Sequence, residues 1–154
     1  MPTIVGATEA AARITDGMTV MVGGFIGCGN AHRVIEAIVA AGPRELTVIC
    51  NDAGKPDFGV GKLVRHRLVR RLIASHVGLN PEVAEQLHEG SIELELVPQG
   101  SLVEKIRAGG AGLGGVLTPT GLGTTVADGK QVVEVRGVPY LLEEPLRADV
   151  ALLN

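Results

Sequence analysis

Short apolar runs alternate along the chain with longer segments in which apolar residues recur every three or four positions. Continuous apolar runs of four to eight residues are typical of buried strands. We predict such strands over residues 18–22, 46–50, 69–74 and 92–97, the last with alternating apolar and acidic positions. The segments between the runs are long enough for helices, which is the pattern of βαβ units.

Helix start and stop signals mark these intervening segments. Asn30 and Asn80 are good N-cap residues, and Asn80 precedes a proline in the first helical position. A Ser-x-x-Glu capping box occurs near residue 101. The predicted helices run from a Thr8 cap to Ile14, from Asn30 to Gly42-Pro43, from Asn80 to Gly90 and from Ser101 to about Ala108.

The alternation of strands and helices predicts an α/β fold, with a mostly parallel open sheet and helices on both faces. Two short strands over 132–135 and 140–142, separated by a turn that contains Arg-Gly, predict a small antiparallel hairpin. Residues 149–154 are predicted to form a strand buried on both faces, which usually continues into an element that covers it. We therefore expect residues 1–154 to form a single domain whose C-terminal part is missing.

Parallel βαβ units bind ligands at the carboxyl ends of their strands. Four segments of the chain follow predicted strands in this way. They are residues 23–30, Asn51-Asp52, Ser75-His76 and Pro98-Gln99-Gly100. We expect these segments to form one candidate site.

Glycine is the outlier of the composition, with 22 residues that cluster at 23–29, 109–115 and 121–123. The first cluster, GGFIGCGN, fits either a loop that lets backbone approach a bulky anionic ligand or a tight turn that needs small residues. Its G-x-G, at Gly27 and Gly29, lacks the third glycine of a dinucleotide fingerprint. The segment 109–125 is either a long functional loop without secondary structure or a surface connection.

Charge and composition exclude several functions. A formal net charge of −3, with two Phe, one Tyr and no Trp, argues against nucleic-acid binding. No apolar stretch approaches the roughly 20 residues of a membrane span, and the N-terminus lacks the basic and apolar regions of a secretory signal. Cys28 and Cys50 are expected to be reduced thiols, and we expect a cytoplasmic protein.

Other reactive residues form no clear catalytic pattern. The basic run from Arg65 to Arg71 favours solvated charge over an anion site. The four histidines lack metal-ligand spacing, so no metal is predicted. Cys28 precedes a predicted helix, which can activate a thiol, but no base stands at a defined spacing from it. The residues thus predict binding loops without an obvious nucleophile.

Several stretches are similar to one enzyme family. DGMTVMVGGFIGCGNA (16–31) resembles the N-terminal signature of two-subunit class I coenzyme A (CoA) transferases, with Ala31 where the signature has proline. Further similar stretches are IASHVGLNPE (73–82), LVPQGSLVEKIRAGGAGLGGVLTPTGLGT (96–124) and LLEEPLRADVALL (141–153). Essentially the whole chain resembles the α subunit of these enzymes, especially of the acetate/acetoacetate type. Family α subunits are longer, in line with the missing C-terminal part.

The resemblance implies a divided active site. In the family, a glutamate of the partner β subunit attacks an acyl-CoA thioester and later carries CoA as a glutamyl thioester. The implied substrates are an acyl-CoA and a short-chain carboxylate such as acetate or acetoacetate, with no tightly bound cofactor, in a hetero-oligomer. Gln99 is the implied oxyanion-hole side chain. The implied CoA-binding loop consists of Gly24, Phe25, Ile26, Gly27, Cys28, Gly29 and Asn30.

Two other functions remain open at this point. One is a sugar-phosphate isomerase-like enzyme of the same broad α/β type, which would need its own acid/base carboxylate. The other is a catalytically inactive binding or assembly subunit.

Overall fold

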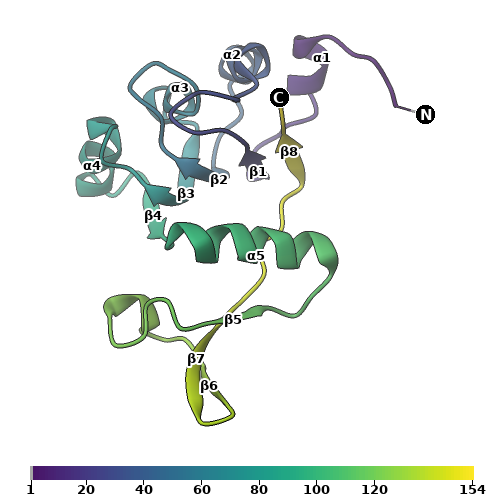
Figure 1. The fold of residues 1–154 in the computed structure, drawn as a ribbon. Coiled ribbons are helices and arrows are strands. Elements are labelled where there is room, and N and C mark those ends of the chain that lie inside the picture. Colours follow the sequence, from purple (N-terminus) through teal and green to yellow (C-terminus); the bar gives the residue numbers. More distant parts are fainter. Residues whose placement is uncertain (1) are drawn as a thin grey trace. The chain divides into compact units, whose positions relative to one another are not determined.

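The computed structural model describes residues 2–154, which form two compact units. The first unit comprises residues 2–96 and 148–154, and the second comprises residues 97–147. The elements of the first unit, labelled in Figure 1, are α1 (Ala7–Ala11), β1 (Thr19–Val22), α2 (His32–Ala41), β2 (Leu46–Asp52), α3 (Gly61–Arg65), β3 (Val69–His76), α4 (Pro81–His88), β4 (Glu93–Leu96) and β8 (Val150–Leu152).

The first unit is built on a five-stranded sheet in the order β4-β3-β2-β1-β8, and every neighbouring pair is parallel. Val20, Val48 and Leu72 are aligned across three strands, so their side chains share one face. Ile35 and Ile38 of α2 are fully buried in the same cluster. Helices α1 to α4 pack side by side in sequence order (Figure 1).

The second unit contains α5 (Gln99–Ala111), β5 (Val116–Thr118), a 3-10 helix at Thr125–Ala127, β6 (Val132–Val135) and β7 (Val138–Glu143). Its three strands form an antiparallel sheet in the order β5-β7-β6. Arg136 and Gly137 join β6 to β7, and both have positive φ, as in the type I′ turns of tight hairpins. The mostly parallel sheet with helices and a small antiparallel part confirms the predicted fold class.

Strands β2 and β3 extend two residues beyond their predicted ends, so Asn51-Asp52 and Ser75-His76 occupy final strand positions. The predicted structureless loop at 109–125 is wrong, because it contains the end of α5 and all of β5. Strand β5 pairs with β7.

The strand predicted near the end of the chain exists as β8, but it is not buried on both faces. Its single neighbour in the sheet is β1, with Val20 opposite Val150 and Val22 opposite Leu152. Leu152 is buried and Ala151 is exposed. In the described part of the chain, β8 is therefore an edge strand, and the alternation of exposed Ala151 with buried Leu152 shows that only one of its faces is covered.

Helix caps were predicted with mixed success. The side chain of Asn80 caps α4 by accepting the N–H of Glu82 at 3.2 Å, as predicted. Helix α2 ends at Gly42 in the left-handed conformation, also as predicted. Gly6 rather than Thr8 caps α1, and this helix ends at Ala11.

The capping box at Ser101 is also wrong. Helix α5 begins two residues earlier, at Gln99, after an N-cap formed by Pro98. Ser101 therefore lies within the first helical turn, where its buried hydroxyl has no hydrogen-bond partner in the described part of the chain.

Within residues 2–154, no helix has both the length and the apolar character that crossing a bilayer would require.

Candidate functional site

The carboxyl ends of β1, β2 and β3 lie along one edge of the parallel sheet, because the strands are aligned in register. Val22 stands opposite Cys50, and Asp52 stands opposite His76. The hydroxyl of Ser75 donates to the carbonyl of Asn51 at 2.7 Å and links the carboxyl ends of β2 and β3. The structure thus brings three of the four predicted segments together within the first unit. Pro98-Gln99-Gly100 belongs to the second unit.

The loop at 24–30 folds back on itself in a tight turn. The N–H of Phe25 donates to the carbonyl of Cys28 at 2.8 Å, and the N–H of Cys28 donates to the carbonyl of Phe25 at 2.9 Å. Between them Ile26 and Gly27 both have positive φ, 48° and 82°. Gly24 has a φ of 117°, and a Cβ there would lie 2.5 Å from the carbonyl oxygen of Cys28. The tight-turn interpretation is therefore correct for the backbone.

A second loop, residues 54–60, has a similar outline and was missed by the sequence analysis. Phe58 donates its N–H to the carbonyl of Lys55 at 3.1 Å. Asp57 has a φ of +57° after Pro56, as in a type II turn. A signal was present: Gly54 and Gly59 repeat the positions of Gly24 and Gly29 at a distance of 30 residues, and Pro-Asp is a turn pair.

The two loops pack against each other through Phe58. A Cβ at Gly27 would lie 2.1 Å from the Phe58 ring, so the ring covers the glycine at van der Waals distance. The ring of His32 stacks at a tilt on Phe58, with centroids 4.9 Å apart. Its Nε2 lies 2.9 Å from the carbonyl of Gly27, to which it donates because a carbonyl oxygen can only accept.

Two buried polar side chains join the loops from opposite ends. Asn30, only 4% exposed, donates to the carbonyl of Gly23 at 2.7 Å and accepts the N–H of Val60 at 3.1 Å. Asp52, 5% exposed, accepts the N–H of Ile26 at 2.9 Å and that of Gly54 at 2.8 Å. The amide of Asn30 is used inside the loop pair, which explains why Ala31 instead occupies the N-cap position of α2 without a side-chain cap.

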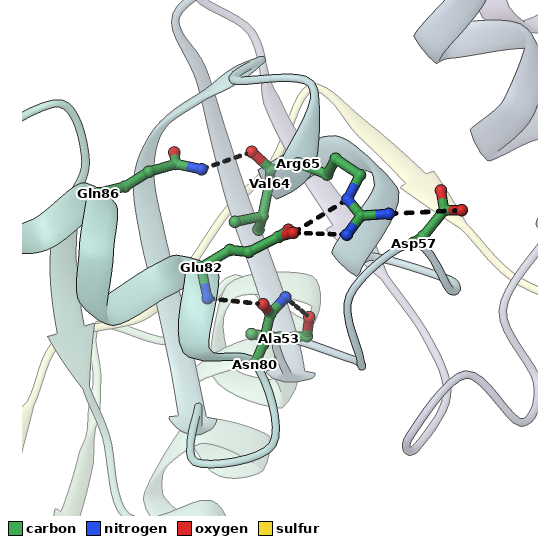
Figure 2. Close-up of polar contacts among 7 residues, drawn as sticks. All are labelled: Ala53, Asp57, Val64, Arg65, Asn80, Glu82 and Gln86. Atoms are coloured by element: carbon green, nitrogen blue, oxygen red, sulfur yellow. Dashed lines mark hydrogen bonds and ion pairs between the residues drawn. The ribbon is translucent and has the colours of Figure 1, made fainter.

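Asn80 ties the start of the second loop to α4. Figure 2 shows its amide donating to the carbonyl of Ala53, at 3.0 Å, while its oxygen caps the N–H of Glu82. In the same view, Arg65 of α3 donates from Nε and Nη2 to one oxygen of Glu82, at 2.9 and 2.8 Å. Its Nη1 lies 3.6 Å from the carboxylate of Asp57, so the guanidinium links α4 to the tip of the second loop.

The basic run beyond Arg65 forms surface ion pairs. Arg67 contacts Glu89 at 2.7 Å, and Arg70 contacts Glu93 at 2.8 Å. The hydrogen bond from Arg67 holds the pKa of Glu89 below its ordinary value. These exposed arginines are compensated by carboxylates, which confirms the prediction of solvated charge rather than an anion site.

The outward-facing residues of the first loop are Gly24, Phe25, Cys28 and Gly29, whereas Gly27 and Asn30 are buried. Phe25 is the most exposed large side chain of the loop, at 59%. Cys28 and Cys50 are unpaired, as predicted. Burial raises the pKa of the Cys50 thiol far above its ordinary value, and the neighbouring charge of Asp52 adds to this shift.

Gln99, the remaining candidate residue, is the first residue of α5, and it is exposed within the second unit. In the part of the chain that the structure describes, no three side chains of His, Cys, Asp and Glu are grouped as a metal site would require.

Comparisons with known proteins point to one family. The family described as Coenzyme A transferase matches residues 4–154. The acetate CoA-transferase subunit alpha of Escherichia coli strain K12 is 52% identical over 95% of this chain. The acetoacetyl-CoA:acetate/butyrate CoA transferase alpha subunit of Clostridium acetobutylicum is 51% identical over 90% of it. The chain spans 66% and 64% of the length of these two relatives, just under two thirds.

A solved structure is also similar. It is an acyl-CoA transferase from Escherichia coli O157:H7, described as a thioester complex with CoA. The similarity covers 96% of this chain and 33% of that protein, with a TM-score of 0.81 and 26% identity. Neither the isomerase-like alternative nor the inactive-subunit alternative gains support from these comparisons.

Proposed function

The chain belongs to the coenzyme A transferase family, and we propose that it is the α subunit of a heteromeric enzyme that moves CoA between an acyl-CoA and a short-chain carboxylate. The proposed carboxylates are acetate and acetoacetate. Acetate is in the names of both relatives described above, and acetoacetate is the acid of the acetoacetyl-CoA in the second name. The proposed partner is a β subunit that supplies the nucleophilic glutamate.

One observation carries this proposal. The glycine-rich loop at 24–30 lies at the carboxyl end of a parallel strand, where α/β sheets bind their ligands. Its interior is fixed by buried hydrogen bonds, while its outer backbone and the Phe25 ring face solvent. We propose that the exposed residues Gly24, Phe25, Cys28 and Gly29 contact CoA, and that Ile26, Gly27 and Asn30 maintain the shape of the loop.

The proposed reaction proceeds in two half-reactions. The glutamate of the partner attacks the thioester carbonyl of the acyl-CoA, and the CoA thiolate leaves as a mixed anhydride forms. The thiolate then attacks the glutamyl carbonyl, releases the first carboxylate and leaves CoA as a glutamyl thioester. A second carboxylate takes CoA by the same steps in reverse.

Gln99 is the proposed oxyanion donor of this chain. Its amide is neutral at all pH values at which the enzyme would work, and it can donate to the negative oxygen of a tetrahedral intermediate. Its exposed position at the first residue of α5 leaves the side chain accessible to a substrate.

The test is reconstitution with a β subunit of the acetate CoA-transferase type, followed by an assay of acetoacetate-dependent CoA transfer. We expect activity only in the mixture, and Gln99→Ala should lower kcat by about 10²–10³. Gln131→Ala removes another exposed amide of the same unit and should leave the rate unchanged. Transfer activity in the chain alone, or an unaltered kcat in Gln99→Ala, would contradict the proposal.

Two unpaired cysteines fit a reducing compartment, and the cytoplasm is the proposed location.

A further inference from the structure

The carboxylate of Asp52 is the buried group that contacts both loops through backbone N–H groups. One oxygen accepts the N–H of Ile26 at 2.9 Å, and the other accepts the N–H of Gly54 at 2.8 Å. The side-chain amide of Asn51 donates to the first oxygen at 3.3 Å. Hydrogen bonds from N–H groups to an ionised carboxylate are roughly twice as strong as bonds between neutral groups. Asp52 therefore holds one residue in each loop from the end of a rigid strand.

The residue that Asp52 holds in the first loop is conformationally strained. Ile26 has a φ of +48°, and a β-branched side chain in the left-handed region is a genuine outlier. Such a residue keeps this conformation only when its surroundings impose it. The two hydrogen bonds between Phe25 and Cys28 close the turn around Ile26, and the hydrogen bond from the N–H of Ile26 to Asp52 is the restraint that reaches this residue from outside the loop.

We infer that Asp52 is a positioning residue that keeps Ile26 in the left-handed conformation and so holds the loop at 24–30 in its binding shape. The inference rests on the proposed function, because that function assigns acyl-CoA binding to this loop. Without the carboxylate, Ile26 returns to an extended conformation and the turn between Phe25 and Cys28 opens. A smaller fraction of molecules then has a competent loop, and the apparent affinity for acyl-CoA falls by that fraction.

Asp52→Asn is the variant that tests this role with the least change in volume. An asparagine oxygen can still accept the N–H of Gly54, but its NH₂ group then faces the N–H of Ile26. In the reconstituted enzyme we expect KM for acyl-CoA to rise about tenfold, with kcat and KM for acetoacetate nearly unchanged. Asp57→Asn is the control, since it removes an exposed carboxylate from a residue of the second loop that also has a positive φ.

A second substitution distinguishes positioning from a general structural role. Ile26→Gly removes the strain, because glycine adopts a positive φ without steric cost. If Asp52 acts by restraining Ile26, the double variant Asp52→Asn/Ile26→Gly should have nearly the same KM for acyl-CoA as Ile26→Gly alone. Ile26→Ala removes the same side chain but keeps the strained Cβ, so Asp52→Asn should still raise KM in that background.

Hydrogen–deuterium exchange of the 154-residue chain without a partner provides a readout that does not depend on transferase activity. Asp52→Asn should accelerate exchange in peptides covering 24–30, while β3 stays as protected as in Asp57→Asn. If the wild-type mixture transfers no CoA, the proposed function fails, and the exchange data still decide the role of Asp52. Unaltered exchange at 24–30 in Asp52→Asn, or a KM defect that persists in the Ile26→Gly background, overturns the inference.

Discussion

The loops at 24–30 and 54–60 follow neighbouring parallel strands, and each is closed by one pair of residues three positions apart, Phe25 with Cys28 and Lys55 with Phe58. They reach this shape with different residues. The first loop has Ile26-Gly27 at its tip, both at positive φ, whereas the second has Pro56-Asp57, where only Asp57 has a positive φ. Two different residue pairs, Ile26-Gly27 and Pro56-Asp57, therefore allow the same tight turn at the end of a parallel strand.

The two loops also differ in how they are fixed from outside. The first is held by buried hydrogen bonds from Asn30 and Asp52 and is covered on one side by Phe58. The second has an ion pair at its tip, from Asp57 to Arg65, in addition to buried contacts. The first loop thus depends on its neighbour through the Phe58 ring and the N–H of Val60, and damage at these contacts, rather than at the Asp57 ion pair, should be transmitted to it.

The largest effect is expected where the second loop meets α3. A Cβ at Gly61 would lie 1.9 Å from the carbonyl oxygen of Lys55, and a backbone atom cannot move aside without opening the turn. Gly61→Ala should lower the free energy of unfolding by about 3 kcal/mol, measured by urea denaturation. Gly110→Ala, in open space within α5, is the control and should be neutral or stabilising. Equal stabilities for the two variants would mean that the second loop is not tightly packed.

A smaller effect tests the contact between the loops. Gly27→Ala introduces a Cβ at a φ of 82° and forces the Phe58 ring to move, which together should cost about 2 kcal/mol. Because the strain at Gly27 remains when Phe58 is truncated, Phe58→Ala should remove only the part of this cost that comes from the ring. A double-mutant cycle measures that part directly. If the losses of unfolding free energy in Gly27→Ala and Phe58→Ala are additive, the Phe58 ring does not pack tightly on Gly27.

The sequence predicted the parallel sheet, the helices α1, α2, α4 and α5 and the first loop, because each has a local signal. It did not predict α3, a helix of five residues. The apolar runs around Val20, Val48 and Leu72 mark strands, and the density of glycine marks the loop. The contacts that shape the site have no such signal. Asn30 is a good N-cap in isolation, but the backbone of Val60, thirty residues away, takes its oxygen. This long-range hydrogen bond, which competes with capping of α2 by Asn30, can form only when the second loop is folded against the first.

The predicted role of Gln99 has no signal within the chain. It depends on a partner subunit and on a substrate rather than on contacts within the chain. The exposed position of Gln99 at the start of α5 is compatible with that role, and its assignment stays a prediction.

Asn80 follows β3 and resembles Asn30 in one respect. Each side-chain amide donates to the backbone carbonyl just before a loop, Ala53 for the second loop and Gly23 for the first. The side chain of Asn80 also caps α4, and the residue is 1% exposed. Asn80→Ala should lower the free energy of unfolding by about 1.5 kcal/mol, from a lost cap and an unsatisfied buried carbonyl. Thr124→Ala removes an exposed cap from the 3-10 helix and should cost clearly less. A similar loss in both variants would mean that Asn80 acts only as a cap.

The smallest effect concerns the ion pair between the helices that follow the two loops. Lys62 of α3 donates to Glu36 of α2 at 2.8 Å, and this hydrogen bond holds the pKa of Glu36 below its ordinary value of 4.5. A carboxylate whose pKa is lowered by folding stabilises the folded state above its unfolded-state pKa, and that stabilisation is lost as the pH falls through the folded-state value. Glu36→Gln should therefore have a small effect at pH 7, because exposed pairs contribute little, and none at a pH well below 4.5. Urea denaturation of both proteins across that range measures the difference. A large loss of stability in Glu36→Gln at pH 7 would mean that the ion pair between α2 and α3 holds the two loops together as strongly as the buried hydrogen bonds do. A small loss means that Asn30 and Asp52 provide the main connection.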